Sequence, residues 1–137
     1  MRLYRILIFV FVFTSISLVN SSCSKTNTPT TVVGFWVGTY GITGSPTRYY
    51  ISFDLRPDGT FLQKGTGADT NTYYGQGTYT VNGANLNYSD TTLNLSQTGA
   101  VEIGTGTYTA AAGTITGSWQ NPGSNTVIGT FSVTKSE

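Results

Sequence analysis

The chain contains no histidine and only one cysteine, Cys23. Without histidine, neither a Ser/His/Asp triad nor a Cys/His pair can form, and the His/Cys clusters that hold zinc are excluded. A single cysteine leaves no intramolecular disulfide. We therefore expect no catalytic residue, no metal site and no cofactor, and we predict that the protein is not an enzyme.

Charged residues are also scarce, at 9% of the chain against about a quarter in ordinary globular domains. Two of the seven basic residues, Arg2 and Arg5, lie in the first five positions, and without them five basic residues face six acidic ones, a net charge of −1. No basic stripe remains to neutralise phosphates, so we predict that nucleic acid is not a partner.

The N-terminal segment has the pattern of an export signal. Arg2 and Arg5 precede an almost wholly apolar run over residues 6–19, which small polar residues then follow. The run is shorter than the roughly 20 residues needed to span a bilayer, so a retained transmembrane anchor is the weaker alternative. We predict that residues 1–22 are a signal peptide and that the protein is exported.

Residues 20–23, Asn-Ser-Ser-Cys, resemble the lipobox of bacterial lipoproteins, although Asn20 stands where an aliphatic residue is usual. The resemblance implies that Cys23 becomes the first mature residue and carries acyl chains such as palmitate. It further implies a membrane-anchored lipoprotein at the periplasmic or outer-membrane surface, with residues 23–32 as a flexible tether. An ordinary signal peptide with an incidental cysteine is the alternative. The sequence does not indicate an oligomeric state.

From residue 33 onward the hydrophobic pattern has a period of two, as in half-buried strands. Tyr49, Ile51, Phe53 and Leu55 fall on one face of the clearest example. Arg56-Pro57-Asp58-Gly59 and Asn82-Gly83 are typical tight-turn sequences. The expected strands are 33–42, 47–56, 60–64, 72–81, 84–89, a short one at Leu93 and Leu95, 100–109, 114–120 and 126–135.

Short connections favour antiparallel pairing of successive strands, and few charges are present to protect an open sheet edge. No segment of ten or more residues after the signal has helical periodicity. We therefore predict an all-β domain over residues 33–137, an antiparallel up-and-down meander barrel of about eight strands.

Gly34-Phe35-Trp36 opens the first expected strand, and this Gly-x-Trp with the following meander resembles the lipocalin-like (calycin) barrels. The resemblance implies a barrel that tryptophan closes at one end and that a ligand enters at the other. The avidin-like barrels are a second family of similar size. The implied function is non-enzymatic binding of a small apolar or amphipathic ligand.

Nine aromatic residues fall on the expected inner face and are the candidate ligand-binding residues. They are Trp36, Tyr40, Tyr49, Phe53, Phe61, Tyr73, Tyr79, Trp119 and Phe131. The alternative is that these side chains simply fill the barrel. The protein would then be a structural module that binds proteins or glycans through exposed aromatics such as Tyr50, Tyr74 and Tyr88.

Among the strand residues, Asp54 and Glu102 could supply the paired carboxylates of glycoside hydrolysis, but exposed charges on the outer face are the simpler interpretation. Asp54 and Asp58 flank a turn. One such pair is more typical of solvated turn chemistry than of a calcium site.

Overall fold

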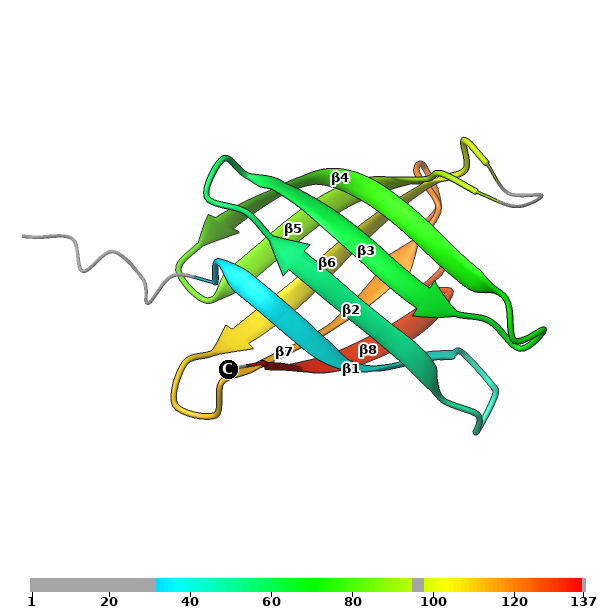
Figure 1. Ribbon diagram of the computed structural model, residues 1–137, viewed down its shortest axis with the longest axis horizontal. Coiled ribbons are helices and arrows are strands. Elements are labelled where there is room, and N and C mark those ends of the chain that lie inside the picture. The colour runs from blue at the N-terminus through cyan, green and yellow to red at the C-terminus, as the bar shows by residue number, and fades with distance from the viewer. Residues whose placement is uncertain (1–31, 95–97, 137) are drawn as a thin grey trace, which may run out of the picture.

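The computed structural model describes residues 32–94 and 98–136, which form eight antiparallel strands closed into one barrel (Figure 1). Each strand pairs with its neighbours in the chain, and the last strand pairs with the first, so the predicted up-and-down barrel is confirmed. The strands are β1 (Gly34–Ile42), β2 (Tyr49–Leu55), β3 (Thr60–Thr66), β4 (Thr72–Asn82), β5 (Asn85–Thr92), β6 (Val101–Thr109), β7 (Thr114–Gln120) and β8 (Gly129–Lys135).

The predicted turns form where their residue types require them. Gly59 ends the Arg56-Pro57-Asp58-Gly59 turn with a φ of 81°, and its N–H donates to the carbonyl of Arg56 at 3.2 Å. Gly83 adopts a φ of 61° between β4 and β5. Glycine tolerates this region of backbone space because it has no Cβ.

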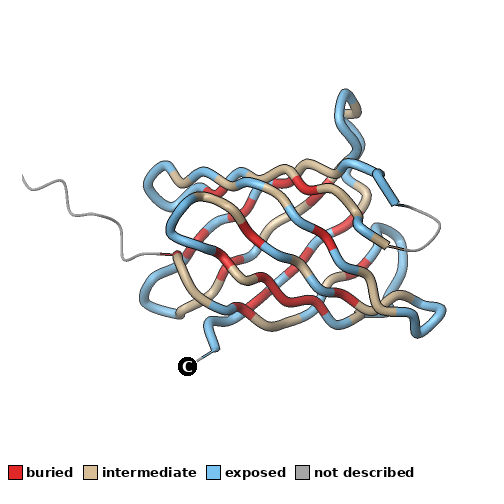
Figure 2. Tube along the Cα trace, turned by 45° about the horizontal axis from the view of Figure 1, so that its top comes forward, coloured by how far each residue is buried: buried red, intermediate tan, exposed pale blue. Residues whose placement is uncertain are grey.

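Buried residues recur along the strands between less buried ones (Figure 2). This is the pattern that arises when side chains alternate and one face of each strand lies inside the barrel. The interior core contains most of the large apolar residues, and Trp36 has no exposed surface. Its buried members are Val32, Trp36, Ile51, Phe53, Leu55, Phe61, Leu86, Tyr108, Ile115, Trp119, Phe131 and Val133.

The barrel has two different ends. Trp36 near the start of β1 is paired in register with Lys135 at the end of β8, so both strands meet at one end, which we call the tryptophan end. The β2–β3, β4–β5 and β6–β7 turns lie there too (Figure 1). The β1–β2, β3–β4, β5–β6 and β7–β8 loops surround the opposite end, which we call the loop end.

One expected strand is wrong in the part of the chain that the structure describes. Leu93 is not in a strand: β5 continues to Thr92, and the chain then turns, with the N–H of Gly99 donating to the carbonyl of Thr92. Leu95 lies outside the described residues. Within residues 32–94 and 98–136, no helix is long and apolar enough to cross a membrane. The signal peptide (1–22), Cys23 and almost all of the tether lie outside the described residues.

Candidate functional site

The tryptophan end of the barrel is filled by side chains. Trp36 donates its indole N–H to the carbonyl of Val32 at 2.7 Å, and Tyr108 packs edge-on against its ring at 5.8 Å. The Lys135 Nζ lies 5.7 Å from the Trp36 ring centre, within the range of a cation–π contact. This arrangement closes the end at which the chain enters and leaves the barrel.

The middle of the barrel is also solid. Phe53, Phe61, Tyr88 and Phe131 form a cluster of rings with centres 5.4–6.1 Å apart. About 10 Å³ of empty space remains among these side chains, which is room for no more than a single water. Five candidate aromatic residues that were predicted to face inward belong to the buried core: Trp36, Phe53, Phe61, Trp119 and Phe131.

The loop end is hollow. A cavity of about 400 Å³ opens there, below the loops and above the ring cluster. Its apolar wall includes Tyr40, Ile51 and Trp119, and the rings of Tyr40 and Trp119 meet edge to face with centres 5.5 Å apart. Gln63 and Glu102 supply polar groups. The mixture of apolar walls and a few polar groups is typical of small-molecule sites.

Three of the nine candidate aromatic residues line this cavity, namely Tyr40, Tyr73 and Trp119. Tyr49 does not line the cavity, but its ring packs against that of Tyr40 with centres 5.4 Å apart. Tyr79 lies at the tryptophan end, where its hydroxyl donates to the carbonyl of Arg56 at 2.6 Å. The predicted set is thus divided between a filled half and a hollow half.

At the rim of the cavity, hydrogen bonds fix the β3–β4 loop. The Tyr73 hydroxyl donates to the Asp69 carboxylate at 3.1 Å, and the Asn71 amide donates to the same carboxylate at 2.6 Å. The bond from Asn71 lowers the pKa of Asp69, which keeps this acid ionised at the mouth. The Tyr40 hydroxyl donates to the carbonyl of Thr66 at 3.0 Å and so ties β1 to the end of β3.

Tyr88 was predicted to be an exposed aromatic residue, and that prediction is wrong. Its ring points inward, lines the bottom of the cavity and packs on Phe61 at 5.6 Å. Gly104 makes this possible, because a Cβ there would overlap with the Tyr88 ring. Burial, followed by the negative charges of Asp90 and Glu102, raises the pKa of the Tyr88 hydroxyl, so it stays neutral.

Two carboxyl groups lie side by side inside the barrel. Asp90 of β5 and Glu102 of β6 are directly paired in register, and Tyr88 and Thr92, which share the inner face with Asp90, line the cavity. Asp90 is 3% exposed, and its Oδ1 has no hydrogen-bond partner. Its Oδ2 lies over Gly75 of β4.

The interior environment makes both acids hard to ionise. Burial, with a contribution from the Glu102 charge, raises the pKa of Asp90 to about 7. Burial also raises the pKa of Glu102. Asp90 is not among the predicted site residues. The two-residue alternation of β5 places it on the inner face with Leu86 and Tyr88, but its charge suggests the outer face.

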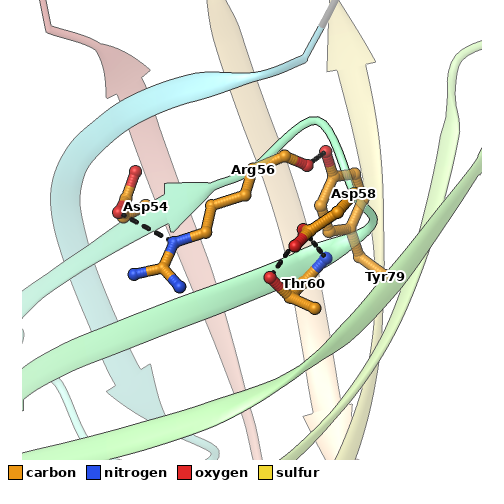
Figure 3. A network of polar contacts seen from close by, with 5 residues as sticks. All are labelled: Asp54, Arg56, Asp58, Thr60 and Tyr79. Atoms are coloured by element: carbon orange, nitrogen blue, oxygen red, sulfur yellow. Dashed lines mark hydrogen bonds and ion pairs between the residues drawn. The ribbon is translucent and has the colours of Figure 1, made fainter.

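The predicted acid pair Asp54 and Glu102 is not a site. Glu102 faces the interior, which corrects its interpretation as an outer-face charge, whereas Asp54 is half-exposed outside, 3.5 Å from the guanidinium of Arg56 (Figure 3). The two carboxyl groups lie on opposite faces of the barrel wall. They cannot act together on one glycosidic bond.

Asp58 has a local structural role in the β2–β3 turn. Its carboxylate accepts the backbone N–H of Thr60 at 2.9 Å and the hydroxyl of Thr60 at 2.6 Å (Figure 3). These bonds lower the pKa of Asp58. Among residues 32–94 and 98–136, no group of three or more metal-binding side chains comes together.

The fold and the site define a class: a small, closed, eight-stranded antiparallel barrel that is solid at one end and hollow at the other. Comparison of the chain with models of protein families, with curated proteins and with solved structures gives no match.

Proposed function

We propose that this protein is an exported, lipid-anchored barrel of the lipocalin-like type that binds a small apolar or amphipathic molecule without transforming it. The observation that carries the proposal is the cavity of about 400 Å³ at the loop end. Ligand pockets in proteins are typically about 300–1,000 Å³. A barrel with a purely structural role would be more stable with a filled interior, as in the closely packed region around Phe53 and Phe61. An unfilled loop end therefore favours a binding function.

The direction of the barrel suits attachment at Cys23. The first described residue, Val32, packs at the tryptophan end against Trp36, and the cavity opens at the opposite end. Acyl chains on Cys23, nine positions before Val32, would therefore approach the barrel from its closed side. The mouth of the cavity would face away from the membrane at the periplasmic or outer-membrane surface.

A cavity-filling substitution tests the binding function. Gly65 lines the cavity, and a Cβ there would have only ordinary contacts, 3.4 Å from the carbonyl oxygen of Tyr50 and 3.7 Å from the Tyr40 ring. We expect Gly65→Phe to fill the cavity and leave the barrel folded. Leu62→Phe, on the exposed outer face of the same strand, is the matched control.

The measurement is native mass spectrometry of the exported protein as isolated and after incubation with a mixture of small apolar compounds. We expect bound molecules on the parent protein and on Leu62→Phe, and none on Gly65→Phe. If the parent protein carries and takes up nothing, or if Gly65→Phe binds as well as the parent, the proposed function is wrong.

The outer surface supports a second candidate, a protein- or glycan-binding module. Tyr74 on β4 and Tyr50 on β2 are 47% and 36% exposed on the outer face of the barrel. Exposed aromatic rings are typical of surfaces that bind other proteins. Tyr74→Ala is expected to abolish capture of an envelope partner in a pull-down while the unfolding midpoint stays unchanged. Unchanged capture would remove this candidate.

A further inference from the structure

The charges around the cavity have one sign. Glu102 and Asp69 line it, and Asp90 does not line it but lies beside it, paired in register with Glu102. No lysine or arginine is among the side chains that line the cavity. Arg48 lies in the β1–β2 loop, but its side chain is on the outside of the barrel, where the guanidinium donates to the Thr39 carbonyl at 3.2 Å. A cavity with walls of low polarity concentrates the negative potential of such groups.

Asp90 is a buried carboxyl group whose hydrogen-bonding capacity is not fully used. The side chain is almost completely buried, it faces the interior between the cavity-lining residues Tyr88 and Thr92, and its Oδ1 accepts no hydrogen bond. Buried polar atoms in native proteins nearly always have a partner. When Asp90 is ionised its oxygens can only accept hydrogen bonds, so in that form the missing partner is a donor, and a positively charged donor is the strongest.

The aromatic wall suits the same kind of group. Tyr40 and Trp119 meet edge to face beside Glu102, and the faces of such rings attract an ammonium group. Calcium would need about six to eight oxygen ligands, and the described residues provide no cluster of three acids. An anionic ligand would be repelled by Glu102 and Asp69 alike.

We propose, building on the binding function above, that the cavity selects small molecules with a protonated amine attached to an apolar body, with the ammonium group held by the Glu102–Asp90 carboxyl pair and the apolar part held by Tyr40 and Trp119. The cation supplies the positive charge that two adjacent buried carboxylates lack. Asp69 at the mouth adds attraction during entry.

The proposal predicts a pH dependence. The titratable groups around the acid pair are Tyr88 beside Asp90 on β5, Tyr40 on β1, Tyr73 at the start of β4 and Asp69 in the β3–β4 loop. The tyrosines stay neutral near neutral pH, so the two carboxyl groups control the charge. Because the pKa of Asp90 is about 7, amine affinity rises with pH through this range while the amine remains protonated.

Three probes of similar shape test the ligand class: 2-phenylethylamine, which is cationic; 2-phenylethanol, which is neutral; and 3-phenylpropionate, which is anionic. Isothermal titration calorimetry uses the exported protein from the full chain, placed in zwitterionic nanodiscs where it is membrane-attached, with empty nanodiscs as blank. We expect the amine to bind at least about tenfold more tightly than the alcohol, as for a charge-assisted hydrogen bond.

Glu102→Gln keeps the size of the side chain and removes its charge, and we expect it to abolish most of the amine preference. Asp54→Asn removes a charge from the outer face and should leave the preference intact. Asp90→Asn is the second test variant. It replaces Glu102→Gln in the same measurement if near-ultraviolet circular dichroism shows that Glu102→Gln does not fold. An amine preference that survives in both Glu102→Gln and Asp90→Asn would overturn the proposal.

A neutral fluorescent probe, N-phenyl-1-naphthylamine, separates this proposal from the proposed function. If the parent protein shows probe binding that Gly65→Phe removes, but the three phenyl compounds bind equally, the cavity binds ligands without selecting amines and only this proposal fails. If Gly65→Phe leaves the probe signal unchanged and no phenyl compound binds, both proposals fail.

Discussion

Replacing Asp90 by asparagine is expected to remove much of the pH dependence of the free energy of unfolding. Asp90 is the most buried carboxyl group among the described residues, and its Oδ1 has no hydrogen-bond partner. In the folded barrel its pKa is raised to about 7, chiefly by burial and further by the charge of Glu102. In the unfolded chain the group returns to its ordinary pKa near 3.9.

The sign follows from proton binding. Between these two pKa values the folded protein keeps a proton on Asp90 that the unfolded chain releases, so the barrel loses stability as the pH rises. A difference of three pKa units corresponds to about 4 kcal/mol at most, of which about 2–3 kcal/mol falls between about pH 5 and about pH 8. Asparagine is neutral at every pH and has no such dependence.

Urea unfolding at both pH values, followed by tryptophan fluorescence, measures the effect. Trp36 and Trp119 both lie in the barrel, so their emission reports its loss, and urea does not change the ionic strength. The parent protein should be less stable at the higher pH, and Asp90→Asn should show a loss smaller by about 2 kcal/mol. Asp54→Asn removes one acid from the outer face and should retain the dependence of the parent.

Equal pH dependence in Asp90→Asn and the parent protein would refute the reasoning. It would mean that the Asp90 carboxyl ionises in the folded barrel as easily as in the unfolded chain. The negative charges of Asp90 and Glu102 would then already have a counter-charge or water in the empty cavity, and the missing donor could not be used as an argument for a ligand.

Two further predictions concern the wall and the anchor. Gly104→Val places a branched side chain where the Tyr88 ring lies and should destabilise the barrel by about 2–3 kcal/mol in the same urea assay, whereas Thr105→Val, next along β6 and exposed, should change little. An unchanged midpoint for Gly104→Val would contradict the packing. The full chain should incorporate radioactive palmitate and Cys23→Ser should not; labelling of both would exclude Cys23 as the acylated residue.

The sequence was sufficient to predict the barrel because local signals agree with the fold along most of the described chain. The alternation of Tyr49, Ile51, Phe53 and Leu55 matches the inner face of β2, and Asn82-Gly83 lies where β4 turns into β5. At Leu93 the apolar pattern misled, because the residue lies in a turn stabilised by the bond from its N–H to the carbonyl of Tyr74 rather than in a strand.

The cavity and its acid pair were much harder to predict. Whether an inner face is filled or hollow depends on the combined volume of side chains from all eight strands, and period-two alternation carries no information on volume. Tyr88 was placed outside, although the alternation from Leu86 places it inside. Asp90 and Glu102 contradict the usual rule that charged side chains face water, so a pattern that assigns faces by polarity places them on the wrong side.

That contradiction is itself informative about function. A neutral polar side chain is present on the same inner surface, because Gln63 lines the cavity too. The fold alone therefore gives no reason for a buried carboxyl group that weakens it at neutral pH. Natural proteins keep such unfavourable groups mainly at functional sites, where a partner restores the lost interactions. The stability cost and the proposed amine preference thus share one origin, and they respond to pH in opposite directions. If the proposal is correct, a rise in pH weakens the empty barrel and strengthens cation binding, a combination that no purely structural role for Asp90 would produce.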